Sequence, residues 1–383
     1  MEGNLPQQQC HPVTTAIEKD DLVIPVSSHS LLHFLEYRLR DEKIIDFGPF
    51  LHGTPADKHE VAMSVVHAFK TSGFLYLSNH GVPPSVVSHV FGTSARFFAR
   101  PQAQKDSLCW TTPQANRGYV KTGQEKLRTV EEDDDDDDDV GTAAAAESRS
   151  IPDLKETMEI GREGVAGLPN RWPEHLDAAG QEFKAVMLSF FERCKALHTA
   201  VMRAIALGMH LPEHYFDSFV DAGDNNLRLL HYPAVDKHIF RDNPLQVRAG
   251  EHSDYGSITL LFQDGRGGLQ VRSPRGTFVD ATPVADTVVV NAGDLLARWS
   301  NDTIKSTRHR VVEPPRVVDE DDKDDADDTG VYPDRYSIAY FCNPNNDQMI
   351  EAIPGTYGED IRPLKYPGIT AGDYLVQRLT ATY

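Results

Sequence analysis

The sequence predicts an α+β fold in which a double-stranded β-helix, or jelly-roll, barrel is flanked by helices. Two observations support this prediction. From residue 226 to 343, short runs of β-branched and aromatic residues alternate with Gly, Pro and Asp turns, as expected of a many-stranded barrel. Before that stretch, apolar residues recur every three or four positions, which is typical of helices that pack one face against a core.

The predicted elements follow in chain order. A helix is expected over residues 59–71, because apolar side chains fall on one face and Gly73 supplies a C-cap. Residues 74–77 then form a strand. A long helix follows, closed by Gly208 and Pro212. Its apolar stripe is expected to pack in the core, and the stripe comprises Phe183, Val186, Phe190, Cys194, Leu197, Val201 and Ile205.

The chain shows no Pro/Gly/Ser-rich linker between independent apolar cores, which favours one compact domain. Four segments are expected within it. They are an N-terminal extension at 1–40, a region with helical support at 41–225 that contains an acidic insert at 131–150, a jelly-roll core at 226–345 with a second acidic insert at 317–330, and a C-terminal segment at 346–383.

The formal net charge of −20 is concentrated in two runs. Glu131 to Asp139 carries −9, and Asp319 to Asp328 carries −7, so the rest of the chain sums to only −4. Blocks of like charge repel one another and stay solvated, so both runs are expected to be loop insertions. The acid excess is therefore no evidence for a cationic partner. A lid over the barrel mouth is the alternative role for these loops.

The N-terminus lacks the basic head and apolar core of a signal peptide, and no apolar run is long enough to span a bilayer. A soluble, cytoplasmic protein is expected. The four cysteines lack metal or redox spacing, so free thiols are expected at Cys10, Cys109, Cys194 and Cys342.

A candidate metal site lies in the run from Arg248 to Phe262, which is interpreted as a strand. Within a strand, His252 and Asp254 leave the same face, and His309 follows on another predicted strand. Two imidazoles and one carboxylate leave open positions that suit Fe(II) chemistry with oxygen. The structural alternative is a strand end with a solvent-facing His–Asp pair.

The chain of sixteen histidines contains a second His-x-Asp pair, His175 and Asp177. It follows Pro173 at the entry to a helix, where positions i and i+2 diverge around the axis, so it is not expected to bind a metal.

A candidate carboxylate site lies in the alternating run Arg335 to Phe341, where Arg335 and Ser337 share one face. A guanidinium fork and a hydroxyl can together donate three hydrogen bonds to one carboxylate. The structural alternative is an ion pair with an acidic residue of the chain. A second Arg-x-Ser pair, Arg298 and Ser300, precedes His309 and is not expected to share this role.

Together these residues resemble the Fe(II) and 2-oxoglutarate dependent dioxygenases, in the branch that contains isopenicillin N synthase and the plant flavonoid oxygenases. The resemblance extends from residues 44–47 through 73–83 to 335–337. Four longer runs resemble the fungal thymine 7-hydroxylase family, at residues 110–119, 227–234, 291–306 and 340–345.

This resemblance implies a site with Fe(II) as metal, 2-oxoglutarate as cosubstrate, O2 as oxidant and ascorbate as a supporting reductant. His252, Asp254 and His309 would hold the iron. Arg335 and Ser337 would bind the far end of the cosubstrate, and Tyr232 would bind its carboxylate near the iron. A core tyrosine with one satisfied hydroxyl is the alternative for Tyr232.

The resemblance also implies a free pyrimidine base as substrate, with no nucleic-acid or membrane partner. The sequence does not predict the oligomeric state. Arg228 would contact the ring, and Phe341 shares the face of Arg335 and Ser337. Strict alternation would turn Tyr255 outward, but a break at Gly256 would let it form the opposite wall. An internal ion pair is the alternative for Arg228.

The implied reaction is hydroxylation of the thymine 5-methyl group, coupled to decarboxylation of 2-oxoglutarate to succinate, and continued to 5-formyluracil and 5-carboxyuracil. One alternative keeps this chemistry but takes a fungal secondary metabolite as substrate. It is distinguished by whether Arg228, Tyr255 and Phe341 converge around a pocket sized for one pyrimidine. The other is a binding protein on an inactive scaffold, which the intact candidate residues disfavour.

Overall fold

The computed structural model describes residues 44–110, 115–124, 153–243, 245–314 and 330–382. Its largest element is an eight-stranded sheet, antiparallel except for its first pair. The strands are, in spatial order, β1 (Ile45–Asp46), β2 (Phe74–Ser78), β11 (Val288–Ala292), β8 (Ile258–Gln263), β14 (Arg335–Cys342), β5 (Asn226–Tyr232), β4 (Glu156–Gly161) and β3 (Gly118–Val120).

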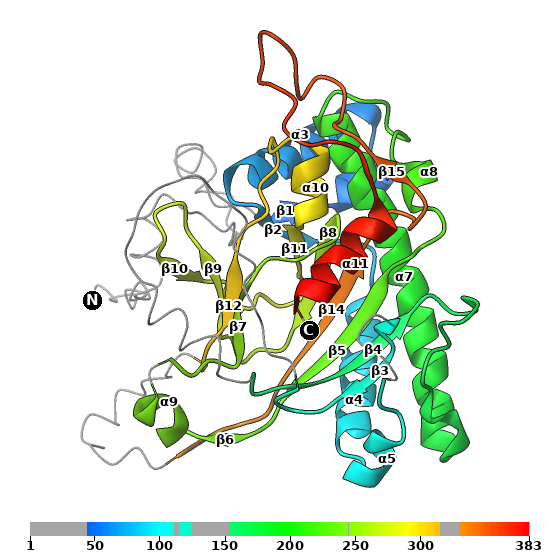
Figure 1. Cartoon of the computed structure of the whole chain (residues 1–383), viewed down its shortest axis with the longest axis vertical. Helices are drawn as coiled ribbons and strands as arrows, with labels where there is room; N and C mark the ends of the chain where they lie inside the picture. The colour runs from blue at the N-terminus through cyan, green and yellow to red at the C-terminus, as the bar shows by residue number, and fades with distance from the viewer. Residues whose placement is uncertain (1–43, 111–114, 125–152, 244, 315–329, 383) are drawn as a thin grey trace, which may run out of the picture.

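A four-stranded antiparallel sheet forms the second layer, on the left in Figure 1. Its strands are β10 (Phe278–Asp280), β9 (Leu269–Arg272), β12 (His309–Val311) and β7 (Ala249–His252). Two short ladders pair β13 (Val331–Tyr332) with β6 (Val235–Asp236), and β15 (Met349–Ile350) with β16 (Ile369–Thr370).

Most helices lie on the side of the larger sheet, and the longest, α7, runs along the right of Figure 1. The helices are α2 (Gly48–His52), α3 (Pro55–Thr71), α4 (Pro84–Phe98), α5 (Gln102–Asp106), α7 (Ala178–Gly208), α8 (Asp217–Val220), α9 (His238–Asp242), α10 (Asp294–Trp299) and α11 (Ala371–Thr382), with a 3₁₀ turn at Pro173–His175.

Apolar side chains form two cores, one on each face of the eight-stranded sheet. The larger core lies between this sheet and the helical layer of α3, α4 and α7, and the smaller one includes side chains of both sheets. Strand β14 divides its side chains between them, because Ile338 and Tyr340 join the larger core and Ala339 joins the smaller. The alternation predicted for this strand is therefore confirmed, and the fold fits the predicted jelly-roll flanked by helices.

Helix α3 begins four residues earlier than predicted because a capping box precedes it. The Thr54 side chain accepts from the backbone N–H of Asp57, and the Asp57 carboxylate accepts from the Thr54 N–H at 2.8 Å. After the helix ends at Thr71, Gly73 has φ +73°, a conformation that favours glycine.

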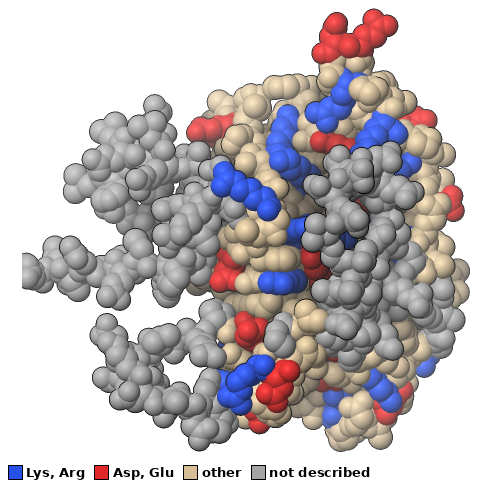
Figure 2. Space-filling view, turned by 60° about the vertical axis from the view of Figure 1, so that its left-hand side comes forward, with Lys and Arg blue, Asp and Glu red and all other residues tan. Residues whose placement is uncertain are grey.

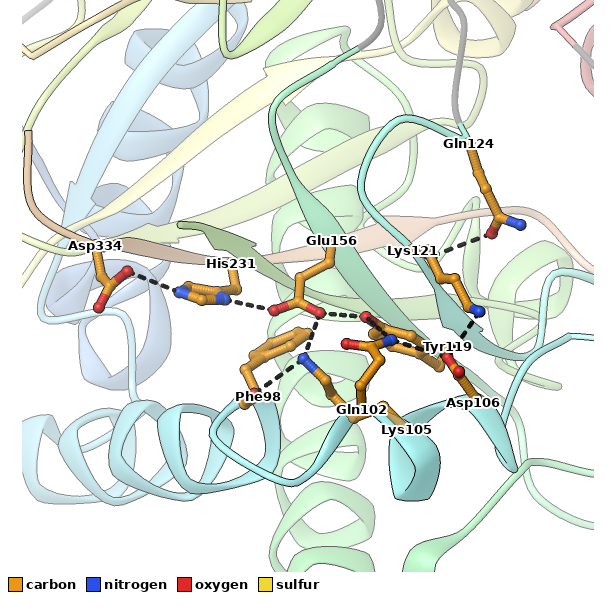
Figure 3. Close-up of polar contacts among 10 residues, drawn as sticks. All are labelled: Phe98, Gln102, Lys105, Asp106, Tyr119, Lys121, Gln124, Glu156, His231 and Asp334. Carbon is orange, nitrogen blue, oxygen red and sulfur yellow. Dashed lines mark hydrogen bonds and ion pairs between the residues drawn. The ribbon is translucent and has the colours of Figure 1, made fainter. Parts of the chain in front are cut away.

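A buried polar network ties β4 and β5 to the helical layer (Figure 3). Glu156 lies at its centre, 2.7 Å from Nδ1 of His231, and it accepts hydrogen bonds from Lys105 at 2.8 Å and from Tyr119. The other ring nitrogen of His231 lies 3.2 Å from Asp334. Burial, the largest influence, raises the pKa of Glu156, but its three hydrogen bonds outweigh this effect and leave that pKa below its ordinary value.

On the face shown in Figure 2, basic and acidic side chains are interspersed rather than separated. Residues 1–43, 131–150 and 317–329, which hold the predicted N-terminal extension and the acidic inserts, lie outside the described ranges. Within those ranges, Cys109, Cys194 and Cys342 are free thiols, as predicted, whereas Cys10 lies outside them. No described helix combines the length and apolar character needed to cross a bilayer.

Candidate iron, cosubstrate and substrate site

Three candidate metal ligands converge at the end of the smaller sheet. His252 is the last residue of β7 and His309 the first of β12, and the two are direct partners across the strand pair. Oδ1 of Asp254 lies 4.0 Å from Nε2 of His252 and 3.8 Å from Nε2 of His309. One donor atom from each residue falls within 4.8 Å of the others, a spacing that lets one metal ion contact all three.

The route by which these residues converge differs from the prediction. The run interpreted as one strand is two strands in different sheets, because β7 ends at His252 and β8 begins at Ile258. Asp254 lies on the loop between them. Gly256 lets this loop approach β14 closely, since a Cβ there would come within 2.3 Å of the Cys342 carbonyl oxygen.

Backbone carbonyls orient both imidazoles. Nδ1 of His252 lies 2.8 Å from the Gly250 oxygen, and Nδ1 of His309 lies 3.3 Å from the Thr307 oxygen. A carbonyl oxygen only accepts hydrogen bonds, so each Nδ1 carries the proton and each Nε2 presents a lone pair. Burial, reinforced by the nearby His309, also lowers the pKa of His252 and keeps its ring neutral.

The Asp254 carboxylate is fixed through one of its oxygens. Oδ2 accepts hydrogen bonds from Thr259 Oγ1 at 2.6 Å and Asn291 Nδ2 at 2.7 Å, which leaves Oδ1 directed at the two imidazoles. Burial raises the pKa of Asp254, but the two histidines and these hydrogen bonds together hold it below its ordinary value. A carboxylate beside two imidazoles is the donor set that a divalent iron requires.

Sequence reasoning missed a buried pair that supports this site. Asp153 accepts from the backbone N–H of Gly250 at 2.9 Å, and Gly250 in turn accepts from His252. Lys155 donates to Asp153 at 2.5 Å and lines the same cavity as His252. The signal was an Asp-x-Lys pair of opposite charges just before β4.

The candidate carboxylate site lies deeper in the barrel. Arg335 is 1% exposed, and it donates to the Gly267 oxygen at 2.7 Å and to Ser337 Oγ at 3.3 Å. Its guanidinium carbon lies 4.7 Å from the ring centroid of Tyr232, its cross-strand partner. Among the described residues, no carboxylate comes within ion-pair distance of Arg335, so the alternative of an internal ion pair is not observed.

A cavity of about 430 Å³ opens beside the metal ligands. Arg228, Tyr255 and Phe341 all line it, together with His252 and Asp254. Tyr255 reaches the cavity because it lies on the loop after β7, where strand alternation no longer applies. This volume falls within the range of about 300–1,000 Å³ that is typical of small-molecule sites.

Arg228 is held by two contacts at the cavity wall. Its Nε lies 2.6 Å from the carboxylate of the fully buried Glu159, and its guanidinium carbon lies 5.2 Å from the centroid of Phe341. The ion pair considered as an alternative role is therefore present. It fixes the orientation of a guanidinium that also lines the cavity.

The aspartate of the second His-x-Asp pair and the arginine of the second Arg-x-Ser pair make contacts that support the fold. Asp177 accepts from the backbone N–H of Gly180 at the start of α7 and forms an ion pair with Arg100, while His175 is exposed. Arg298 lies on α10 and donates to the Pro367 oxygen at 2.7 Å.

The comparisons with known proteins agree with this geometry. Residues 43–175 match a family model described as the N-terminal region of the non-haem dioxygenase in morphine synthesis, and residues 223–344 match the 2OG-Fe(II) oxygenase superfamily. The chain is 35% identical over 349 residues to the 2-oxoglutarate-Fe(II) type oxidoreductase ppzD of Metarhizium rileyi, an alignment that covers 90% of this chain and 92% of that protein. The chain belongs to the 2OG-Fe(II) oxygenase superfamily.

Solved structures give a more specific likeness for this oxygenase. The full-length Neurospora crassa thymine 7-hydroxylase in complex with α-ketoglutarate and thymine is 57% identical, with a TM-score of 0.76, and the match covers 88% of this chain and 96% of that one. Its complex with 5-formyluracil is 55% identical, with a TM-score of 0.74, over 88% and 94% of the two chains. The proline hydroxylase buaE of Petromyces alliaceus is 32% identical over 88% of this oxygenase and 98% of its own length.

The family establishes the cofactors of this oxygenase as Fe(II) and 2-oxoglutarate. The donor set of His252, Asp254 and His309 fits the iron, because its two imidazoles and one carboxylate are already oriented by hydrogen bonds. The protein is therefore an oxidoreductase of the 2-oxoglutarate-dependent dioxygenase type.

Proposed function

We propose that this oxygenase hydroxylates the 5-methyl group of free thymine and continues through 5-formyluracil to 5-carboxyuracil. The observation that carries the proposal is that Arg228, Tyr255 and Phe341 line one cavity with the candidate iron ligands His252 and Asp254. Their convergence on one pocket supports a pyrimidine substrate, while the size of that pocket does not select one. The Neurospora crassa enzyme, solved with thymine and with 5-formyluracil, supports both the substrate and the later oxidation step.

In this proposal His252, Asp254 and His309 hold the iron through Nε2, Oδ1 and Nε2. Iron, once bound with 2-oxoglutarate and oxygen, supplies the oxidising power for the C–H bond, while the protein supplies orientation and excludes water. Gly250, Thr307, Thr259 and Asn291 hold the three donors in place before the metal arrives.

Arg335 and Ser337 bind the cosubstrate at the end remote from the iron. Arg335 is buried without a carboxylate partner among the described residues, and a buried guanidinium is stabilised by an anion that accepts from its fork. The Ser337 hydroxyl lies beside that fork, and the Tyr232 ring packs against its face. The distal carboxylate of 2-oxoglutarate provides the charge that this pocket lacks.

The substrate residues match the shape and polarity of a pyrimidine ring. Tyr255 and Phe341 offer aromatic surface to its two flat faces, and Arg228 donates to a ring carbonyl oxygen. Glu159 fixes the Arg228 side chain at Nε, so little side-chain entropy is lost when the ring binds.

A secondary metabolite is the second candidate substrate, favoured by the size of the cavity and by the range of the relatives. The cavity exceeds the volume of a single pyrimidine, and the 32% identical relative buaE is named as a proline hydroxylase. The thymine 7-hydroxylase is 57% identical to this chain, which is higher than the identity to buaE and supports the thymine proposal.

The experiment that tests the substrate compares wild type with Arg228→Ala and Phe341→Ala. Each variant should lose thymine turnover while binding Fe(II) and 2-oxoglutarate normally, because other residues hold those two. Loss of a charge-assisted hydrogen bond costs about 1.5–3 kcal/mol, or roughly ten- to a hundredfold in turnover at low thymine.

Succinate formed without substrate is the internal control, since it needs only iron, cosubstrate and oxygen. It should persist in both variants. Turnover of thymine at the wild-type rate by either variant would remove that residue from the substrate site.

A further inference from the structure

The C-terminal helix α11 completes the wall of the substrate cavity. Several of its residues line the cavity opposite the barrel, namely Gly372, Asp373, Leu375, Val376 and Leu379. Figure 1 shows this helix, in red, in front of β14. The cavity beside the iron ligands therefore includes a segment far from them in sequence.

Arg378 projects from this helix onto the aromatic wall. Its guanidinium carbon lies 4.9 Å from the ring centroid of Tyr255, and its side chain is only 18% exposed. A cation over the face of a tyrosine ring is attracted by the electron density of that face. Tyr255 lies on a loop, so no strand ladder fixes the plane of its ring.

Asp294 anchors the same arginine to the loop that bears Asp254. Its Oδ2 lies 2.9 Å from Nη2 of Arg378 and accepts from Ser253 Oγ, also at 2.9 Å. Ser253 stands between His252 and Asp254. The backbone N–H of Asp294 donates to the Asp254 carbonyl at 2.7 Å, and the next N–H, of Leu295, donates to the Tyr255 carbonyl at 3.2 Å.

We infer that Arg378 is a positioning residue for the substrate, acting through Tyr255. The Asp294 carboxylate holds the guanidinium, the guanidinium holds the plane of the Tyr255 ring, and the ring offers its surface to the pyrimidine. A wall that is already oriented loses less free energy when the substrate binds, and it keeps the methyl group aligned with the iron. This inference rests on the proposed thymine-oxidising function.

The test compares three single variants of the full-length, iron-loaded enzyme. Arg378→Gln removes the charge and retains a similar length, Arg378→Lys retains a charge for Asp294, and Gln377→Ala alters an exposed neighbour on the same helix. The readouts are KM for thymine, KM for 2-oxoglutarate, and the thymine oxidised per succinate formed. A merely structural residue would not separate the two KM values.

Arg378→Gln should raise KM for thymine by roughly threefold to thirtyfold and lower the coupling ratio, with KM for 2-oxoglutarate unchanged. Arg378→Lys should recover part of the loss, and Gln377→Ala should match wild type. Combining Arg378→Gln with Tyr255→Ala should add little to Tyr255→Ala alone, because the two residues act as one unit.

Two results would overturn the inference while the proposed function stands. One is wild-type KM and coupling in Arg378→Gln, and the other is full additivity of Arg378→Gln with Tyr255→Ala. Failure of the proposed function is distinguishable, because the wild-type enzyme alone would then not oxidise thymine. That result would remove the proposed function, and the inference with it.

Discussion

His252 and His175 each belong to a His-x-Asp pair, yet their surroundings give replacement opposite consequences. Ring Nδ1 of His252 is hydrogen-bonded to Gly250 and its Nε2 faces Asp254, whereas His175 is exposed on a 3₁₀ turn. His252→Ala should abolish iron-dependent turnover without unfolding the protein, and Asp254→Ala should do the same. Activity and bound iron measured on His175→Ala should stay near wild type, and equal losses in both histidine variants would refute the metal assignment.

Arg335 and Arg298 form a second matched pair at the residue scale. Lysine offers a point charge where a carboxylate needs a planar fork, so Arg335→Lys should raise the 2-oxoglutarate requirement by more than about tenfold. Arg298 donates to a backbone carbonyl and packs on Tyr366, outside this pocket, so Arg298→Lys should leave the requirement unchanged. Titration of turnover with 2-oxoglutarate checks both, and an unaltered dependence for Arg335→Lys would show that the cosubstrate pocket is misplaced.

The candidate site could be predicted from sequence where its chemistry is local. His252 with Asp254, and Arg335 with Ser337, are pairs two residues apart whose types alone suggest a metal and a carboxylate. Glu159 and Arg378 could not be found in this way, because they act through contacts with residues distant in the chain. Glu159 is one of two acidic residues in β4, and Arg378 is a basic residue on the C-terminal helix, and such side chains are common without function.

At the scale of elements, the network around Glu156 joins β4 and β5 to α5. Glu156→Gln would leave Lys105 buried without its partner, which should cost about 3 kcal/mol or more of stability. Glu182→Gln, which removes an exposed ion pair, should cost under about 1 kcal/mol. Unfolding by denaturant at neutral pH measures both values, and similar small losses would show that the network contributes little.

The same network has a defined pH dependence. Because the folded pKa of Glu156 lies below its ordinary value of 4.5, its contribution is complete above that pH and is lost as pH falls through the folded pKa. The stability difference between wild type and Glu156→Gln should therefore shrink below pH 4.5. A difference that stays constant into the acid range would contradict this assignment.

The start of α3 was missed although its capping box is a local signal, whereas other boundaries depend on tertiary contacts. Helix α7 ends at Gly208, as predicted, whereas the strand expected across Asp254 is broken into β7 and β8. The break depends on Gly256 approaching the carbonyl of Cys342, a contact between residues 86 positions apart that no local pattern reveals.

At the level of the whole molecule, the jelly-roll class could be predicted from the repeated alternation of side chains along short strands. A sheet with a core on each face requires such alternation in its strands. The position of α11 could not be derived in this way, since its sequence shows an amphipathic helix but not the surface that it covers. The substrate cavity is thus a property of the complete fold, formed where the loop after β7, the strands β5 and β14, and the C-terminal helix meet.

Thymine-dependent succinate formation by the wild-type enzyme is the decisive test of thymine as its substrate. With Fe(II), ascorbate, 2-oxoglutarate and oxygen, thymine should stimulate succinate release, and 5-hydroxymethyluracil, 5-formyluracil and 5-carboxyuracil should appear in that order. One succinate should form for each oxidation step. Succinate release that thymine leaves unchanged, in enzyme loaded with iron, would contradict the account and favour a different small-molecule substrate.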